Sequence, residues 1–169
     1  MTYANGDVTR FSQGTANTVV ELTSIAASPG QTSRVEAWGG VFLLSDRIVE
    51  QPGEPPFLTG YPFDPDAHLP LAPGQHWSEQ ILEGYGGGQA NQLRMELQVY
   101  DARPREIGTC SYDVLPYQLR YGPEGAPNAT VFMEYLPDLG VTLTLGSKSR
   151  SGSRALTDPV RIVAAARGD

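Results

Sequence analysis

The amino-acid sequence predicts an all-β protein: a single antiparallel meander of about eight strands, curled into a barrel or half-barrel, with a β-sandwich as the alternative. Nineteen Gly and fourteen Pro are spread along the 169 residues without a period, which indicates many turns between short elements. Apolar and polar residues alternate in several stretches, whereas helix-forming stretches with a 3.6-residue period are nearly absent. We therefore expect residues 1–169 to form one β domain.

The clearest strand covers residues 93–100, where apolar and polar side chains alternate strictly. The Gly-rich stretch 84–88 before it can only be a turn, so residues 76–83 are expected to form the preceding strand. Such alternation is typical of a sheet with one dry and one wet face. The apolar positions of the clearest strand are Leu93, Met95, Leu97 and Val99.

Residues 107–121 predict one long strand whose apolar parity switches at Leu115-Pro116. Proline cannot donate to a sheet ladder, and a one-residue phase slip is typical of a bulge, so we expect a bulge or bend there. A strand at 129–136, a tight turn at 137–140 and another alternating stretch from residue 141 follow. On this long strand, Cys110 is expected to be a small buried apolar residue.

Two interpretations of the C-terminal region remain. If Ser151-Gly152 forms a two-residue hairpin turn, residues 159–162 pair with 141–144 and Leu143 lies opposite Val160. Alternatively, Asp158 caps a short helix that begins with Pro159. The hairpin is favoured because it places apolar residues opposite apolar residues on one face.

In the N-terminal half, residues 17–27 and 34–44 predict two strands joined by a turn at 28–31. A long Pro-rich segment at about 51–74 follows, and its composition predicts a loop without regular structure. Because the loop contains several aromatic residues, we expect it to pack against the domain as a lid.

Composition excludes several classes of protein. Hydrophobic residues make up 40% of the chain and charged residues 18%, which is too apolar for a disordered chain. The net charge of −7, with only twelve Lys and Arg, argues against binding to nucleic acid. No apolar run approaches the roughly 20 residues needed to span a bilayer. A single cysteine cannot form an internal disulfide.

Two segments of the C-terminal half carry a resemblance. Residues 107–114 (IGTCSYDV) and 134–141 (EYLPDLGV) place a Gly-Thr strand before an aromatic-x-Pro-x-Leu-Gly turn. In this pattern the chain resembles exported bacterial all-β proteins of unknown function, with Cys110 where that family has Phe. The resemblance implies export and a curved antiparallel sheet, and it implies no reaction.

The resemblance favours a periplasmic or extracellular location, with a cytoplasmic location as the alternative. Residues 1–13 lack the apolar core of a signal peptide, so export assumes that a leader was removed.

The first functional hypothesis is a non-catalytic cell-envelope binding or assembly module with a concave apolar face or cavity. Its ligand would be an apolar small molecule or another envelope protein, and no cofactor is expected. Aromatic side chains of the Pro-rich segment and the two tryptophans are expected to border the site, because aromatic rings dominate ligand pockets. The candidate ligand-binding residues are Phe57, Tyr61, Phe63, Trp77 and Trp38.

Two other hypotheses belong to different classes. A carbohydrate-binding or adhesion module would present Trp38 or Trp77 on an exposed surface. A metal-dependent enzyme would hold a divalent ion with Asp64, Asp66 and His68, whose carboxylate and imidazole groups are common metal ligands. Nothing else in the sequence marks a catalytic residue, so a non-catalytic protein is favoured. The sequence does not predict the oligomeric state.

Overall fold

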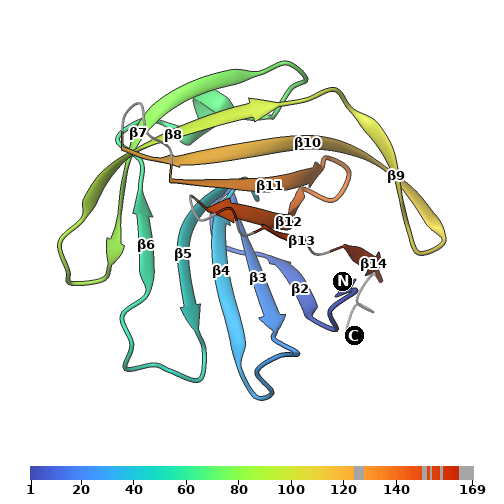
Figure 1. The fold of residues 1–169 in the computed structure, drawn as a ribbon, viewed down its shortest axis with the longest axis horizontal. Helices are drawn as coiled ribbons and strands as arrows, with labels where there is room; N and C mark the ends of the chain where they lie inside the picture. The colour runs from blue at the N-terminus through green and yellow to red at the C-terminus, as the bar shows by residue number, and fades with distance from the viewer. Residues whose placement is uncertain (124–127, 150–151, 153, 157, 164–169) are drawn as a thin grey trace.

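The computed structural model describes residues 1–123, 128–149, 152, 154–156 and 158–163. They form one antiparallel sheet of fourteen strands that rolls into a nearly closed barrel (Figure 1). The predicted meander is confirmed, with more strands than the expected eight. The strands are β1 (Thr2–Tyr3), β2 (Val8–Gln13), β3 (Thr18–Ser24), β4 (Thr32–Trp38), β5 (Phe42–Ile48), β6 (Phe57–Gly60), β7 (His76–Tyr85), β8 (Asn91–Val99), β9 (Arg103–Ile107), β10 (Cys110–Gly122), β11 (Ala129–Leu136), β12 (Val141–Ser149), β13 (Arg154–Leu156) and β14 (Pro159–Arg161).

Most strands pair with their neighbours in sequence. The ladder runs without a crossover from β1 to β8 and continues through β10, β11 and β12 to β13, while β9 pairs with the first half of β10. At the other end of the sheet, β14 pairs with β1. Figure 1 shows the N-terminus beside β14, with β10 and β11 running crosswise above the row of strands β2 to β6. The last strand of the chain therefore lies against the first.

The predicted hairpin at residues 76–100 is confirmed as β7 and β8. Trp77 pairs with Leu97 and Ile81 with Leu93, which places their apolar side chains on one face. Ile81, Leu97 and the neighbouring apolar residues of β8 are almost completely buried. Burial of a Leu or Ile side chain contributes about 1.5–3 kcal/mol, so this face anchors the barrel interior.

The long strand predicted at 107–121 is divided in the structure. Gly108, at φ 65°, makes the turn between β9 and β10. The register between β10 and β11 runs unbroken from Leu115 to Tyr121, so the expected bulge at Pro116 is absent. The parity switch has another cause. Val114 and Leu115 are both buried because they contact two different clusters on opposite faces of β10.

We name these clusters the large core and the small core. The large core lies among β5, β7, β8, β10 and the Pro-rich segment, and it contains most of the buried aromatic side chains. The small core joins β9, β11 and β12 to partly buried residues of β2 and β3. Three consecutive residues at the start of β12 are buried, as expected for a strand covered on both faces. They are Val141, Thr142 and Leu143.

Three expectations for the N-terminal half were wrong. Residues 34–44 are not one strand, because Gly39 and Gly40 adopt positive φ and turn the chain between β4 and β5. The Pro-rich segment contains β6 and a short 3₁₀ helix at Pro65–His68. Strand β2 was not predicted, because this six-residue strand contains only two apolar residues among polar ones.

The C-terminal register also differs from the expectation. Lys148 pairs with Arg154, so the hairpin partner of β12 is β13, one residue out of the predicted register. Strand β14 pairs with β1 instead, and Val160 is exposed. Residue 151 of the expected turn, the flanking residues 150 and 153, and residues 164–166 of the alternative helix lie outside the described residues. The chain thus uses its last described strand to approach its own beginning.

Cys110 is exposed at the start of β10, contrary to the expectation of a buried position. It precedes the part of β10 that enters the cores, which explains the difference. No helix in the described part of the chain is long and apolar enough to cross a membrane.

Candidate functional site

Three of the predicted ligand-binding residues meet in the large core. Tyr61, Phe63 and Trp77 surround Phe42, with ring centroids 5.5, 6.2 and 5.7 Å from it. The Phe42 side chain is 1% exposed. The Tyr61 hydroxyl donates a hydrogen bond to the backbone oxygen of Leu43 at 2.7 Å, and burial raises the pKa of Tyr61 well above its usual value. These rings pack against one another and fill the space in which a cavity was expected.

The remaining predicted ligand residues lie elsewhere. The Trp38 indole Nε1 donates to the Asp66 carboxylate at 2.7 Å at the rim of the barrel. Phe57 begins β6 and lies edge to face with the exposed Tyr85, with a ring-centroid distance of 5.6 Å. The structure therefore separates the five residues into a packed cluster, a rim contact and a surface pair.

The proposed metal ligands are engaged in local contacts. Asp64 caps the 3₁₀ helix by accepting a hydrogen bond from the Asp66 backbone N–H at 3.0 Å. Asp66 accepts from Trp38, and His68 stacks on Trp77 with a centroid distance of 4.5 Å. Within the described ranges, no group of three or more His, Cys, Asp or Glu side chains is placed to hold a metal ion.

The barrel is left incompletely paired between β2 and β12. Strand β2 pairs with β1 only at Val8, and β12 pairs with β13 only from Gly146 onward. Among the described residues, Thr9–Gln13 therefore have a strand partner only in β3, and Val141–Thr144 only in β11. We call the gap between these two half-paired strands the seam. The two sides of the seam are joined by side chains of the small core and not by a backbone hydrogen-bond ladder.

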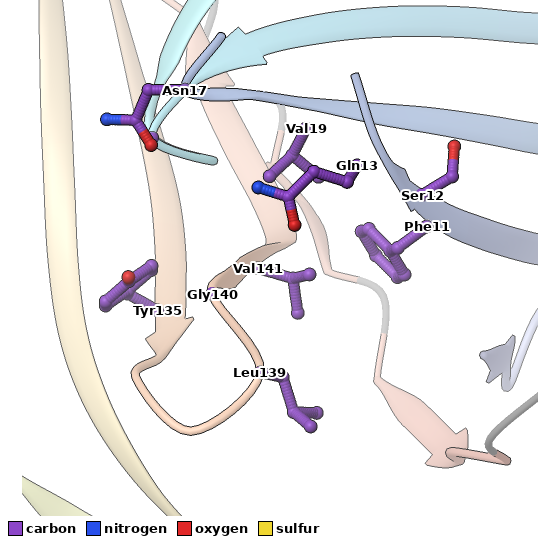
Figure 2. Close-up of a pocket in the computed structure, with 10 residues that line it drawn as sticks. Phe11, Ser12, Gln13, Asn17, Val19, Tyr135, Leu139, Gly140 and Val141 are labelled. Atoms are coloured by element: carbon purple, nitrogen blue, oxygen red, sulfur yellow. The ribbon is translucent and has the colours of Figure 1, made fainter. Parts of the chain in front are cut away.

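A pocket of about 240 Å³ opens at one end of the seam. In Figure 2, Phe11, Gln13 and Val19 lie on one side, and Tyr135, Leu139 and Val141 on the other. The pocket is lined by Phe11, Ser12, Gln13, Asn17, Val19, Gly39, Tyr135, Leu139, Gly140 and Val141. Apolar and polar side chains share its walls: the polar groups are the Ser12 hydroxyl, the Gln13 and Asn17 amides and the Tyr135 phenol.

Two turns bring the walls of the pocket together. A Cβ atom on Gly40 would lie 2.5 Å from the backbone oxygen of Gly140, so only glycine permits this approach. Gly140 itself has a φ of 65° and closes the turn between β11 and β12. Its N–H donates to the Leu136 oxygen at 2.9 Å. The predicted turn at 137–140 is thus confirmed, and it forms one wall of the pocket.

A second, polar pocket of about 210 Å³ lies farther along the seam. The carboxyl of Glu21 lies in it, and burial together with the neighbouring charge of Asp46 raises its pKa to about 7. A hydrogen bond of 2.7 Å joins the Thr9 and Thr23 hydroxyls beside it. Burial also raises the pKa of Tyr3 to about 12, so Tyr3 is a neutral hydrogen-bonding group at physiological pH. The pocket is lined by Tyr3, Asp7, Thr9, Glu21, Thr23, Ser33 and Thr144.

Sequence reasoning missed the residues of both seam pockets. Phe11 and Val19 belong to short strands, and nothing local shows that they lie opposite Val141. The one available signal was the Pro-Asp-Leu-Gly turn, which marks a hairpin but not what it approaches.

Comparison with known proteins gives no match, whether to protein families, to curated sequences or to solved structures. The resemblance to exported bacterial β proteins therefore stays a prediction.

Proposed function

We propose that the protein is a non-catalytic binding module whose ligand site is the pocket at the end of the seam. The single observation that carries this proposal is the pocket itself: it lies where the barrel ladder is interrupted, between residues that are far apart in sequence. The aromatic region predicted to hold a ligand is filled by its own side chains. We therefore place the ligand site in the seam pocket instead.

The lining supports a small ligand with an apolar body and a polar end. Phe11, Val19 and Val141 offer apolar contact, and Leu139 is 45% exposed at the mouth. Gln13 and Asn17 each carry an amide that can both donate and accept hydrogen bonds. A few polar groups among apolar walls are typical of small-molecule sites, which begin at roughly 300 Å³. The volume of about 240 Å³ limits the ligand to a small one.

The lining favours binding over catalysis. The lining includes the hydroxyls of Ser12 and Tyr135, but none of its ten residues is a His, Cys, Asp, Glu or Lys that could act as the general base to activate them. The cell-envelope location remains part of the proposal, and it is supported only by the sequence resemblance.

Native mass spectrometry of protein purified without refolding, before and after solvent extraction, tests the proposal. We expect an added mass that disappears on extraction. In Gln13→Trp, the larger side chain occupies the pocket and the added mass should be lost. Gln92→Trp is the matched control, because Gln92 is also an exposed strand residue and lies outside the seam; it should keep the added mass.

Two outcomes contradict the proposal. One is a wild-type protein that carries no added mass and takes up none from a solubilised lipid and metabolite extract. The other is an added mass that Gln13→Trp retains while its thermal unfolding matches that of the wild type.

A further inference from the structure

A third pocket lies where the loop between β5 and β6 meets the end of β7. Its volume is about 320 Å³, within the range of small-molecule sites. Phe57 pairs with Tyr85 on the neighbouring strand and with Asp46 on the other side. The pocket is therefore built on three adjacent strands and is independent of the seam.

Tyr85 presents an aromatic face to solvent at this site. Its side chain is 64% exposed, the largest exposure among the exposed large hydrophobic residues of the described chain. The Phe57 ring meets it edge to face, with an interplanar angle of 75°. This contact holds the Tyr85 ring in place and leaves ring surface available. An exposed ring held by a neighbour is pre-organised for stacking, since less conformational freedom is lost on binding.

The polar groups around the ring carry mixed charge. Asp46 and Glu54 contribute two carboxylates, Arg47 one guanidinium and Gln51 an amide. Two negative charges against one positive charge give no general attraction for phosphate or other anions. The set does contain hydrogen-bond acceptors and donors within one small pocket. A neutral ligand with many hydroxyl groups can use both kinds.

We propose that this pocket is a carbohydrate-binding site. The apolar C–H face of a sugar ring would stack on Tyr85, while its hydroxyls bond to the carboxylates, amide and guanidinium. The sequence placed an aromatic platform of this kind at Trp38 or Trp77, but both are partly buried in contacts with the large core. Tyr85 and Phe57 supply the exposed platform instead.

The test is binding of the full chain to an array of neutral plant, fungal and bacterial oligosaccharides, followed by calorimetric titration of any sugar bound. We expect Tyr85→Ala to weaken binding by about twofold to twelvefold, because an aromatic contact contributes roughly 0.5–1.5 kcal/mol. Tyr85→Phe keeps the ring face and should stay within about twofold of the wild type. Tyr100→Ala is the matched control, since Tyr100 is 46% exposed and lies outside this pocket.

The proposal is overturned if no neutral oligosaccharide binds, or if Tyr85→Ala and Tyr100→Ala bind equally well. Binding confined to sulfated or uronic-acid glycans and lost at high salt would also overturn it, because charge attraction would then replace ring stacking. Gln13→Trp should leave sugar binding unchanged, so this site and the seam can fail separately.

Discussion

Around the large core, strands β5, β7, β8 and β10 are seven to thirteen residues long, whereas β1, β13 and β14 beyond the seam have only two or three residues. The long strands seal the interior with aromatic packing around Phe42. The short strands leave the seam and its two pockets. Where backbone pairing stops, this fold depends on side chains to complete the barrel.

Besides the small core, a group of charges supports this side of the barrel. Glu134 on β11 is fully buried, and its carboxylate accepts hydrogen bonds from Arg105 and from Arg103, the latter at 2.8 Å. Arg105 also donates to Asp158 at 2.9 Å, just before β14. These contacts connect the interior of the sheet to its last strand. We therefore expect the stability of one side of the barrel to depend on apolar packing in the large core, and that of the other side to depend also on charge pairing. Three measurements test this expectation.

The largest effect is expected in the large core. Phe42→Ala removes a ring that contacts three others and should lower the free energy of unfolding by about 4 kcal/mol. Urea denaturation measures this change. Phe57→Ala is the control, because Phe57 stacks edge to face on the exposed Tyr85 and lies outside the large core; it should cost about 1 kcal/mol. Equal losses in the two variants would show that the large core is not the main source of stability.

The next effect concerns the buried carboxylate. Glu134→Ala leaves Arg105, whose side chain is 18% exposed, without its buried partner and should destabilise the protein by about 3 kcal/mol. Glu96→Ala is the control, since its contact with Arg120 is exposed and 3.9 Å long; it should change stability by about 0.5 kcal/mol or less. If both variants unfold at the same urea concentration, the charge group does not support the small core.

The smallest expected effect is a pH dependence in the polar pocket. Because the pKa of Glu21 is raised to about 7, the folded state holds this proton more tightly than the unfolded state does. The wild type should therefore be most stable relative to Glu21→Gln below pH 4.5 and lose roughly 1–3 kcal/mol of that difference as the pH rises to about 7. Parallel pH profiles of the two proteins, measured by thermal unfolding, would contradict the assignment.

Sequence reasoning succeeded where a signal was local. The alternation from Leu93 to Val99 predicted β8, and the Pro-Asp-Leu-Gly turn predicted the hairpin of β11 and β12. It failed where the deciding contact was distant. Val160 looked like a partner for Leu143, but β14 pairs with β1, more than 150 residues earlier in the chain.

The candidate sites follow the same division. Aromatic composition correctly marked Tyr61, Phe63 and Trp77 as neighbours, yet it could not distinguish a packed cluster from a cavity wall. The seam pocket has no local pattern, because Gln13 and Leu139 are ordinary strand and turn residues until the barrel brings them together.

The pairing of β1 with β14 also sets the order in which the protein can be completed during synthesis. From β2 to β8, each strand can pair as soon as its successor leaves the ribosome, since the partners are adjacent in sequence. Thr2 pairs with Arg161, so the first strand must wait for nearly the whole chain. Contacts of such high sequence separation form slowly. Until then the nascent chain exposes the unpaired edge of β1, and a chaperone that covers this edge would act on the N-terminal strands throughout translation.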